Sequence, residues 1–206
     1  SGEANTIQHN VREILEVCTL TKDVNIDELP IIDVEFYFIN LRAKSVGEVV
    51  ESKYRCNNEV DAPDGGTKTC GNIMEANINL TDIKPVFEKE INPEIQITDN
   101  ITVKMKYPEF SVIRKLENAE TITDVGFELV IDCIDYIYDG DNLYYAHETP
   151  KPEILTFLES LTKEQFDKIE AFGDNMPKLE KKISFICNKC GYNHNINVQG
   201  LDDFFS

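Results

Sequence analysis

The sequence lacks the features that would assign it to several common classes of protein. No apolar stretch approaches the roughly 18 residues that cross a membrane, so we expect no membrane association. The sequence contains no G-x-S-x-G, no H-E-x-x-H and no Walker-type glycine loop, which argues against an enzyme and against a small-molecule substrate. Six cysteines in 206 residues are too sparse for a secreted disulfide scaffold.

Basic residues are also scarce. Only 20 Lys and Arg stand against 38 Asp and Glu, so the net charge is −18. Binding to a nucleic-acid backbone needs a basic stripe that displaces counterions, and the longest basic cluster here, residues 178–182, is interrupted by Glu180. Nucleic-acid binding is therefore disfavoured. An apolar content of 41% with 28% charged residues indicates a globular chain rather than a disordered one.

Four of the cysteines form two pairs typical of a metal site. The later pair, Cys187 and Cys190, is a C-x2-C-G motif, and its glycine permits the positive φ that lets backbone amides point at sulfur. The earlier pair, Cys56 and Cys70, is also followed by glycine, although a longer loop separates its members. Four thiolates make a closed tetrahedral site, so we expect one structural Zn2+ bound by all four. The alternative is two disulfides or four unrelated buried thiols.

The two pairs also share their flanking sequence. Each reads aromatic-x-Cys, a turn, Cys-Gly, and then a short strand with Ile-Asn followed by Leu or Val. This repeat predicts two β-hairpin knuckles facing each other across one metal, which is a zinc ribbon. The ribbon would be split, because residues 71–186 separate its halves, and we place it at residues 49–80 plus 183–199.

The remaining candidate side chains have simpler interpretations. We place Cys18 on the apolar stripe of a first helix and Cys133 in a helical run, where free cysteine behaves as a small hydrophobe. No histidine or asparagine context marks either as a nucleophile. His194 lies four residues after Cys190 and could replace a ligand. With four cysteines available, we expect it on the surface of the ribbon.

Apolar spacing predicts the elements around the ribbon. Residues 7–18 have the spacing of an amphipathic helix, and residues 30–42 are dense enough in apolar side chains for a buried helix. Residues 94–107 alternate apolar and polar side chains around a central Asp-Asn turn, which predicts a β-hairpin over residues 91–108.

The chain beyond this hairpin has a helical character, and we predict a helical insertion over residues 110–179. Within it, residues 121–138 show apolar residues largely at helical spacing. Thr162 and Gln165 have the spacing of a capping box at the start of a further helix.

These elements together predict an α+β protein, with a mainly helical domain, a split zinc ribbon and an additional β-hairpin. We expect the whole chain, residues 1–206, to form one compact unit. Phe204 and Phe205 near its end are expected to be tucked against the core, or alternatively to dock into a neighbouring protein.

Several segments resemble one known family. They are residues 41–48 (LRAKSVGE), 157–169 (FLESLTKEQFDKI), 176–179 (MPKL) and 200–205 (GLDDFF). Together with Cys187-x2-Cys190, these segments are similar to signatures of the T-even-type bacteriophage base plate protein family, whose members are baseplate hub components. The resemblance spans most of the chain, and its motifs are not catalytic.

The resemblance implies a tail structural protein or a hub-assembly protein of a contractile-tailed phage. We therefore expect a structural or assembly component of the baseplate hub that is held together by zinc and contacts other baseplate or tail subunits. It implies a location in the tail baseplate of the virion, and in the host cytoplasm during assembly. The alternative function is a zinc-ribbon nucleic-acid-binding or transcription-associated protein.

Overall fold

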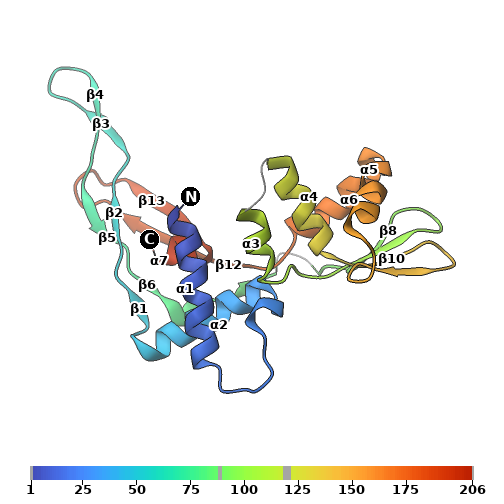
Figure 1. Ribbon diagram of the computed structural model, residues 1–206. Coiled ribbons are helices and arrows are strands. Elements are labelled where there is room, and N and C mark those ends of the chain that lie inside the picture. The colour runs from blue at the N-terminus through green and yellow to red at the C-terminus, as the bar shows by residue number, and fades with distance from the viewer. Residues whose placement is uncertain (1, 88–89, 118–121, 206) are drawn as a thin grey trace. The chain divides into compact units, whose positions relative to one another are not determined.

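Each half of the fold is built from two separate stretches of the chain (Figure 1). The computed structural model describes residues 2–87, 90–117 and 122–205. The first unit comprises Ser1–Val34 and Phe87–Pro177, and the second comprises Glu35–Val86 and Lys178–Ser206. One compact unit over the whole chain stays a prediction.

A four-stranded antiparallel sheet lies at the centre of the first unit. Its strands follow the order β11-β10-β9-β8. They are β8 (Glu94–Gln96), β9 (Thr102–Met105), β10 (Ile134–Tyr138) and β11 (Leu143–Tyr145). β8 and β9 form the hairpin that the alternating pattern predicts, and Val103 and Met105 on one face of β9 are buried.

Helices α4 (Ile122–Asp132), α5 (Lys151–Ser160) and α6 (Lys163–Asp174) pack with this sheet in the core of the first unit. The unit also contains α1 (Gly2–Cys18), the 3-10 turn η1 (Ile26–Glu28) and α3 (Val112–Glu117). The core cluster includes side chains of the sheet, of α4, of α5 and of α6, among them Val103, Ile131, Ile134, Leu158 and Phe172. The capping box of Thr162 and Gln165 is confirmed at the start of α6.

The helix predicted over residues 121–138 is wrong in its second half. α4 ends at Asp132, and β10 pairs with β9 and β11 instead. Residues 134–138 are isoleucine and tyrosine at four of five positions, and such side chains favour a strand once neighbouring strands are available. Thr121 itself lies outside the described residues. The region 110–179 thus contains β10, β11 and the start of β12 (Lys178–Ile186) as well as helices, and the described chain mixes helix and sheet.

The two cysteines outside the pairs also differ from expectation. Cys18 is exposed at the end of α1, while Val11 and Leu15 of the same helix are buried. Its position on the predicted apolar stripe is therefore wrong, because the helix ends at Cys18 and leaves this side chain in solvent. Cys133 is buried as predicted, but it lies between α4 and β10 rather than inside a helix.

The second unit is a set of short antiparallel strands with one helix at each end. Its elements are α2 (Ile31–Ser45, beginning in the first unit), β1 (Val49–Val50), β2 (Lys53–Arg55), β3 (Glu59–Asp61), β4 (Thr67–Thr69), β5 (Ile73–Glu75), β6 (Ile78–Asn79), the 3-10 turn η2 (Leu80–Asp82), β7 (Pro85–Val86), β12 (Lys178–Ile186), β13 (Asn193–Gln199) and α7 (Gly200–Phe205). β1 pairs with β6, β2 with β5 and β3 with β4, so these three pairs are nested along one chain segment.

A longer hairpin of β12 and β13 forms the rest of the second unit, with β7 on the free edge of β12. Helix α7 packs against this hairpin. Phe204 is fully buried, and the ring of Phe205 meets the ring of Phe38 in α2 edge to face at 5.7 Å. The expectation that these two phenylalanines are tucked against the core is confirmed.

Candidate metal centre

Four cysteines come together where two turns of the second unit meet. Cys56 follows β2 and Cys70 precedes β5, while Cys187 and Cys190 lie in the turn between β12 and β13. Their four Sγ atoms all lie within 4.8 Å of one another, and Cys56, Cys70 and Cys187 are buried. The two halves of the cluster are far apart in sequence, because Cys70 and Cys187 are separated by 117 positions.

The sulfur spacing fits a shared cation better than disulfides. The Sγ atoms of Cys56 and Cys190 lie 3.6 Å apart, and those of Cys70 and Cys187 lie 3.9 Å apart. A disulfide needs about 2.05 Å between its sulfurs. Zinc bound to sulfur at about 2.3 Å in a tetrahedron places neighbouring sulfurs about 3.8 Å apart. The donor set and its spacing therefore suit a tetrahedral thiolate site.

The two turns that hold the sulfurs are closed by the same pair of hydrogen bonds. These run at 2.8–3.0 Å from Cys56 N to Asn72 O, from Gly71 N to Cys56 O, from Cys187 N to Tyr192 O and from Gly191 N to Cys187 O. Both glycines have the positive φ that the sequence predicts, +65° for Gly71 and +75° for Gly191. The first turn is thus a second copy of the C-x2-C-G turn, despite the longer segment between its cysteines.

That longer segment folds as a hairpin of its own. β3 and β4 pair in register, and a turn with a hydrogen bond from Ala62 N to Gly66 O joins them. Cys70 N donates to Asn58 O at 2.8 Å, so the ladder continues from this hairpin to the cysteines. Residues 57–69 are therefore inserted into the turn without changing its closure.

Two asparagines of the first turn reach sulfurs of the second. Asn58 Nδ2 lies 3.7 Å from Cys190 Sγ, and Asn72 Nδ2 lies 3.6 Å from Cys187 Sγ. An amide N–H directed at sulfur stabilises the thiolate form. Sequence reasoning missed both residues. Their signal is positional, because each asparagine lies two residues after a cysteine.

His194 is not on the surface, and that prediction is wrong. It is 3% exposed, the only buried polar or charged residue among those the structure describes. Its Nε2 lies 3.1 Å from Cys56 Sγ. The β12–β13 register places His194 opposite Phe185, and the ring centroids of Tyr54, Phe185 and Tyr192 lie 4.8–5.4 Å from its own. The strand pairing therefore turns this histidine towards the sulfurs.

The thiols of the cluster differ in acidity. Burial raises the pKa of Cys56 to about 12, although the backbone amide of Asn58 acts in the opposite direction. Burial also raises the pKa of Cys187, but the backbone amides of Cys190 and Lys189, together with neighbouring thiols, outweigh it and lower the value to about 6. The C-x2-C turn thus stabilises a thiolate before any cation arrives, and a bound cation would favour the thiolate at the other positions.

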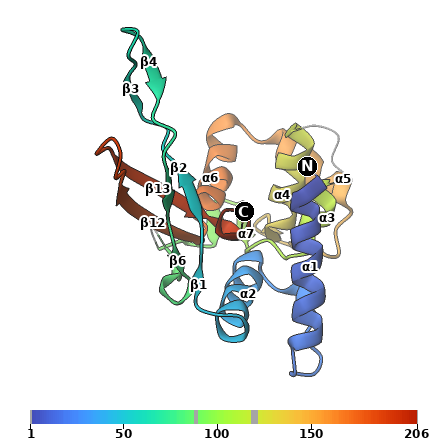
Figure 2. The same cartoon turned by 90° about the vertical axis from the view of Figure 1, so that its left-hand side faces the viewer.

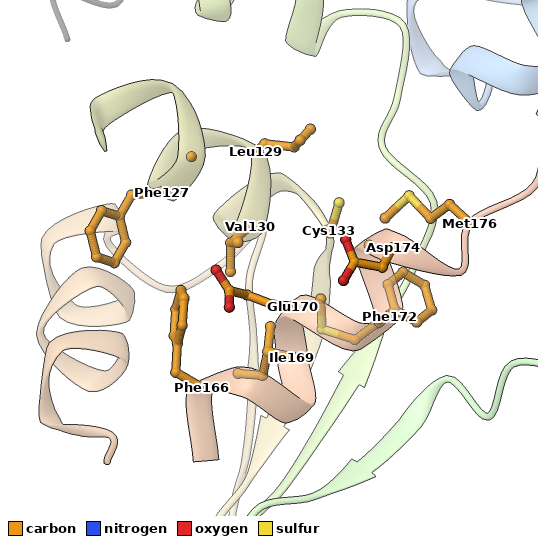
Figure 3. Close-up of a pocket in the computed structure, with 13 residues that line it drawn as sticks. Phe127, Leu129, Val130, Cys133, Phe166, Ile169, Glu170, Phe172, Asp174 and Met176 are labelled. Atoms are coloured by element: carbon orange, nitrogen blue, oxygen red, sulfur yellow. The ribbon is translucent and has the colours of Figure 1, made fainter. Parts of the chain in front are cut away.

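The first unit contains a separate cavity of about 720 Å3 between α4 and α6 (Figure 3). Its lining is mostly apolar, with Phe127 and Phe166 at one end. Glu170 and Asp174, one helical turn apart, are the carboxylates of this lining. Burial raises the pKa of the Cys133 thiol to about 12, so at neutral pH this lining residue is no nucleophile. The cavity is suited to apolar groups rather than to acid–base chemistry.

Comparison with known proteins gives one match. A family model described as T4 bacteriophage base plate protein matches residues 1–206, which is the whole chain. No curated protein and no solved structure matches it. Within residues 2–87, 90–117 and 122–205, no helix has the length and apolar character needed to cross a membrane.

Proposed function

Because the chain belongs to the T4 bacteriophage base plate protein family, we propose that it is a structural or assembly component of the baseplate hub, held together by one zinc ion. Family membership implies a location in the tail of the virion and contacts with other phage structural proteins. The family description names no reaction. Beyond family membership, we infer that the chain lies in the hub, binds one zinc ion and is present in the host cytoplasm during assembly.

In this proposal Cys56, Cys70, Cys187 and Cys190 are the four zinc ligands of a split ribbon formed by residues 49–80 and 183–199. The observation that carries it is the convergence of four thiols from two turns with identical backbone closure. Four thiolates close the coordination sphere, which is the arrangement of a structural zinc rather than a catalytic one.

Zinc would supply stability that the strands around it lack. β1, β2, β5 and β6 are two or three residues long, and two-stranded pairs of this length are marginal in water. Zinc binding to such sites contributes roughly 10–16 kcal/mol of apparent free energy, which becomes folding free energy. The ion would therefore fasten two distant chain segments into one unit.

Protein–protein contact is the mode of action we favour. A net charge of −18 opposes the approach of a nucleic-acid backbone, so the alternative of a nucleic-acid-binding zinc ribbon has less support. The same charge suits partners with basic surfaces.

Metal content tests the zinc site. We expect about one zinc per chain, by mass spectrometry of the protein purified under reducing conditions, and no zinc in Cys190→Ser, whose apparent stability falls by several kcal/mol. The changes Cys56→Ser, Cys70→Ser and Cys187→Ser should have the same effect.

Cys18→Ser is the matched control, because Cys18 is exposed and distant in sequence from both turns. It should retain the metal and the stability of the unchanged chain. An unchanged chain without metal, or a Cys190→Ser protein with full stability after metal removal, would contradict the zinc proposal.

The hub role is tested in the phage. When Cys190→Ser replaces the natural chain during infection, we expect tails with incomplete baseplates in electron micrographs. Quantitative mass spectrometry of purified virions then separates a permanent component, present at fixed stoichiometry, from an assembly factor that is absent. Complete baseplates formed without any copy of the chain would contradict both roles.

A further inference from the structure

The turn between Cys56 and Cys70 does not need the β3–β4 hairpin for its closure. The turn of Cys187 and Cys190 closes with two residues between its cysteines, and the turn of Cys56 and Cys70 closes with the same hydrogen bonds around residues 57–69. A two-residue connection would therefore serve the cysteines equally well. The inserted residues need another explanation.

The hairpin buries little of its own surface. All three residues of β4 are exposed, and in β3 only Val60 is partly buried. Figures 1 and 2 show the hairpin extending beyond the cysteine turns, with no other strand beside it. Ordering these residues costs conformational entropy that so little burial does not offset. The stability of its own unit therefore does not account for this segment, whereas contact with another molecule would.

The base of the hairpin is fixed to the cysteine cluster. Val60 packs against the cluster, and Asn58 joins it twice, by accepting from Cys70 N and by donating to Cys190 Sγ. These contacts set the direction in which the hairpin leaves the site. A rigid base reduces the ordering cost of binding, because less freedom is lost when a partner engages the tip.

The exposed charges of the hairpin are mostly negative. Glu59, Asp61 and Asp64 are all exposed, against a single basic residue, Lys68. The tip is held by a turn in which Gly65 has φ +85° and Gly66 N donates to the Asp64 carboxylate. An ordered, acidic and otherwise unpartnered hairpin is complementary to a basic protein surface.

We propose that the β3–β4 hairpin is a docking arm that binds a positively charged surface of another baseplate protein, with its direction set by the cysteine cluster. The inference rests on the proposed baseplate function, because that function supplies the partner. It does not require that the bound metal be zinc.

The first test variant removes the arm and keeps the site. Residues 59–69 are deleted, which keeps Asn58 and gives the first turn the spacing of the second, Cys56-Asn57-Asn58-Cys70-Gly71. The second variant keeps the arm and reverses its charge through Glu59→Lys, Asp61→Lys and Asp64→Lys. Its matched control carries the same change of charge on exposed helical positions of the first unit, through Glu153→Lys, Glu159→Lys and Glu164→Lys.

The probe is baseplate assemblies purified from cells infected by a phage that lacks this chain. We expect the unchanged protein and the control to co-sediment with them, less strongly at 200 mM than at 50 mM salt. Both arm variants should bind about tenfold or more weakly, while their metal content and melting temperature stay within error of the unchanged protein.

The docking-arm proposal would be overturned if both arm variants bound with the affinity of the unchanged protein. It would also be overturned if the unchanged protein did not bind. If the control variant bound as weakly as the arm variants, the effect would come from net charge alone, and the docking-arm proposal would again be overturned. A metal-free protein whose arm variants still lose binding would overturn the zinc site alone and support the arm.

Discussion

At the scale of single residues, three side chains without a thiol contact the cysteine cluster. His194 contributes a ring nitrogen 3.1 Å from Cys56 Sγ, and Asn58 and Asn72 direct amides at two other sulfurs. Partners of this kind orient metal ligands and stabilise the thiolate form. The rings of Tyr54, Phe185 and Tyr192 pack around the imidazole of His194 at centroid distances of 4.8–5.4 Å.

His194→Phe tests this role. Phenylalanine keeps a ring among Tyr54, Phe185 and Tyr192 but removes the nitrogen beside Cys56 Sγ. We expect zinc affinity, measured by competition with a chromogenic chelator, to fall about 10- to 100-fold with the fold retained. His147→Phe is the control, because His147 is largely exposed in the first unit. If His194→Phe kept the zinc affinity of the unchanged protein, His194 would act through packing alone.

The cysteines could be predicted from the sequence, and their neighbours could not, for a physical reason. The C-x2-C-G spacing is local, and the repeat of Cys-Gly after Cys70 marks the second pair without tertiary information. The burial of His194 depends on the register of β12 with β13 and on the approach of Tyr54 from another strand pair. No spacing in the sequence encodes that approach. The metal itself stays a prediction.

At the scale of elements, the start of helix α7 lies beside a largely buried carboxyl group of α2. Glu35 of α2 lies close to the start of α7, where its Oε1 would be 3.7 Å from a Cβ placed on Gly200. Burial, and then the charge of Asp202, raise the pKa of Glu35 from 4.5 to about 7, while the backbone amide of Leu201 acts in the opposite direction. The ionised carboxylate is thus unfavourable in the folded chain.

The stability of the second unit should therefore depend on pH. A carboxyl whose pKa rises on folding holds its proton more tightly when folded, so its favourable contribution is complete below pH 4.5 and is lost as the pH rises to about 7. Glu35→Gln removes this loss of stability at high pH, because glutamine does not ionise. We expect it to raise the unfolding free energy at pH 8 by roughly 1–2 kcal/mol, with little change at pH 5.

Urea unfolding at the two pH values measures this difference. Glu164→Gln is the control, because Glu164 is exposed in the first turn of α6. A Glu35→Gln protein with the same pH dependence as the unchanged chain would show that Glu35 ionises freely when folded.

Secondary structure was predictable where the local signal was complete. The hairpin of β8 and β9 and the capping box of α6 follow from alternation and from two side chains. The boundary between α4 and β10 does not, because Ile131, Ile134 and Ile137 keep a spacing of three residues, which fits a helix, across the start of the strand. A register shift between Ile134 and Tyr136 breaks the alternation that would have marked the strand. Pairing with β9, which precedes β10 by about 30 residues, decides the strand, and that is tertiary information.

At the scale of the whole molecule, the two units differ in what holds them. The first has a cluster of apolar side chains between its sheet and its helices. The second has buried apolar side chains around Leu201 and Phe204 as well, but its short strand pairs β1–β6 and β2–β5 lead to a cluster of four thiols. Removal of the metal should therefore destabilise the second unit more than the first.

Chelation tests this difference in the intact chain. After zinc removal under reducing conditions, we expect amides of β2, β5, β12 and β13 to lose at least tenfold of their protection from hydrogen exchange. Amides of β9 and β10 should keep theirs. Hydrogen exchange read by mass spectrometry resolves the two sets. Equal loss in both units would show that zinc, or its removal, acts on the chain as one cooperative body.

The sequence separation of the two cysteine pairs also determines when the cluster can form during translation. Cys187 follows Cys70 by 117 positions, and ribosomes add about 5–20 residues per second, so the early thiols wait roughly 6–23 s for their partners. The stretches of the first unit are complete once Pro177 has been translated, whereas the second unit needs the residues that follow. The segment that follows Pro177 therefore closes the cysteine cluster, and the arm mounted on it acquires a fixed direction only once Cys190 has been translated.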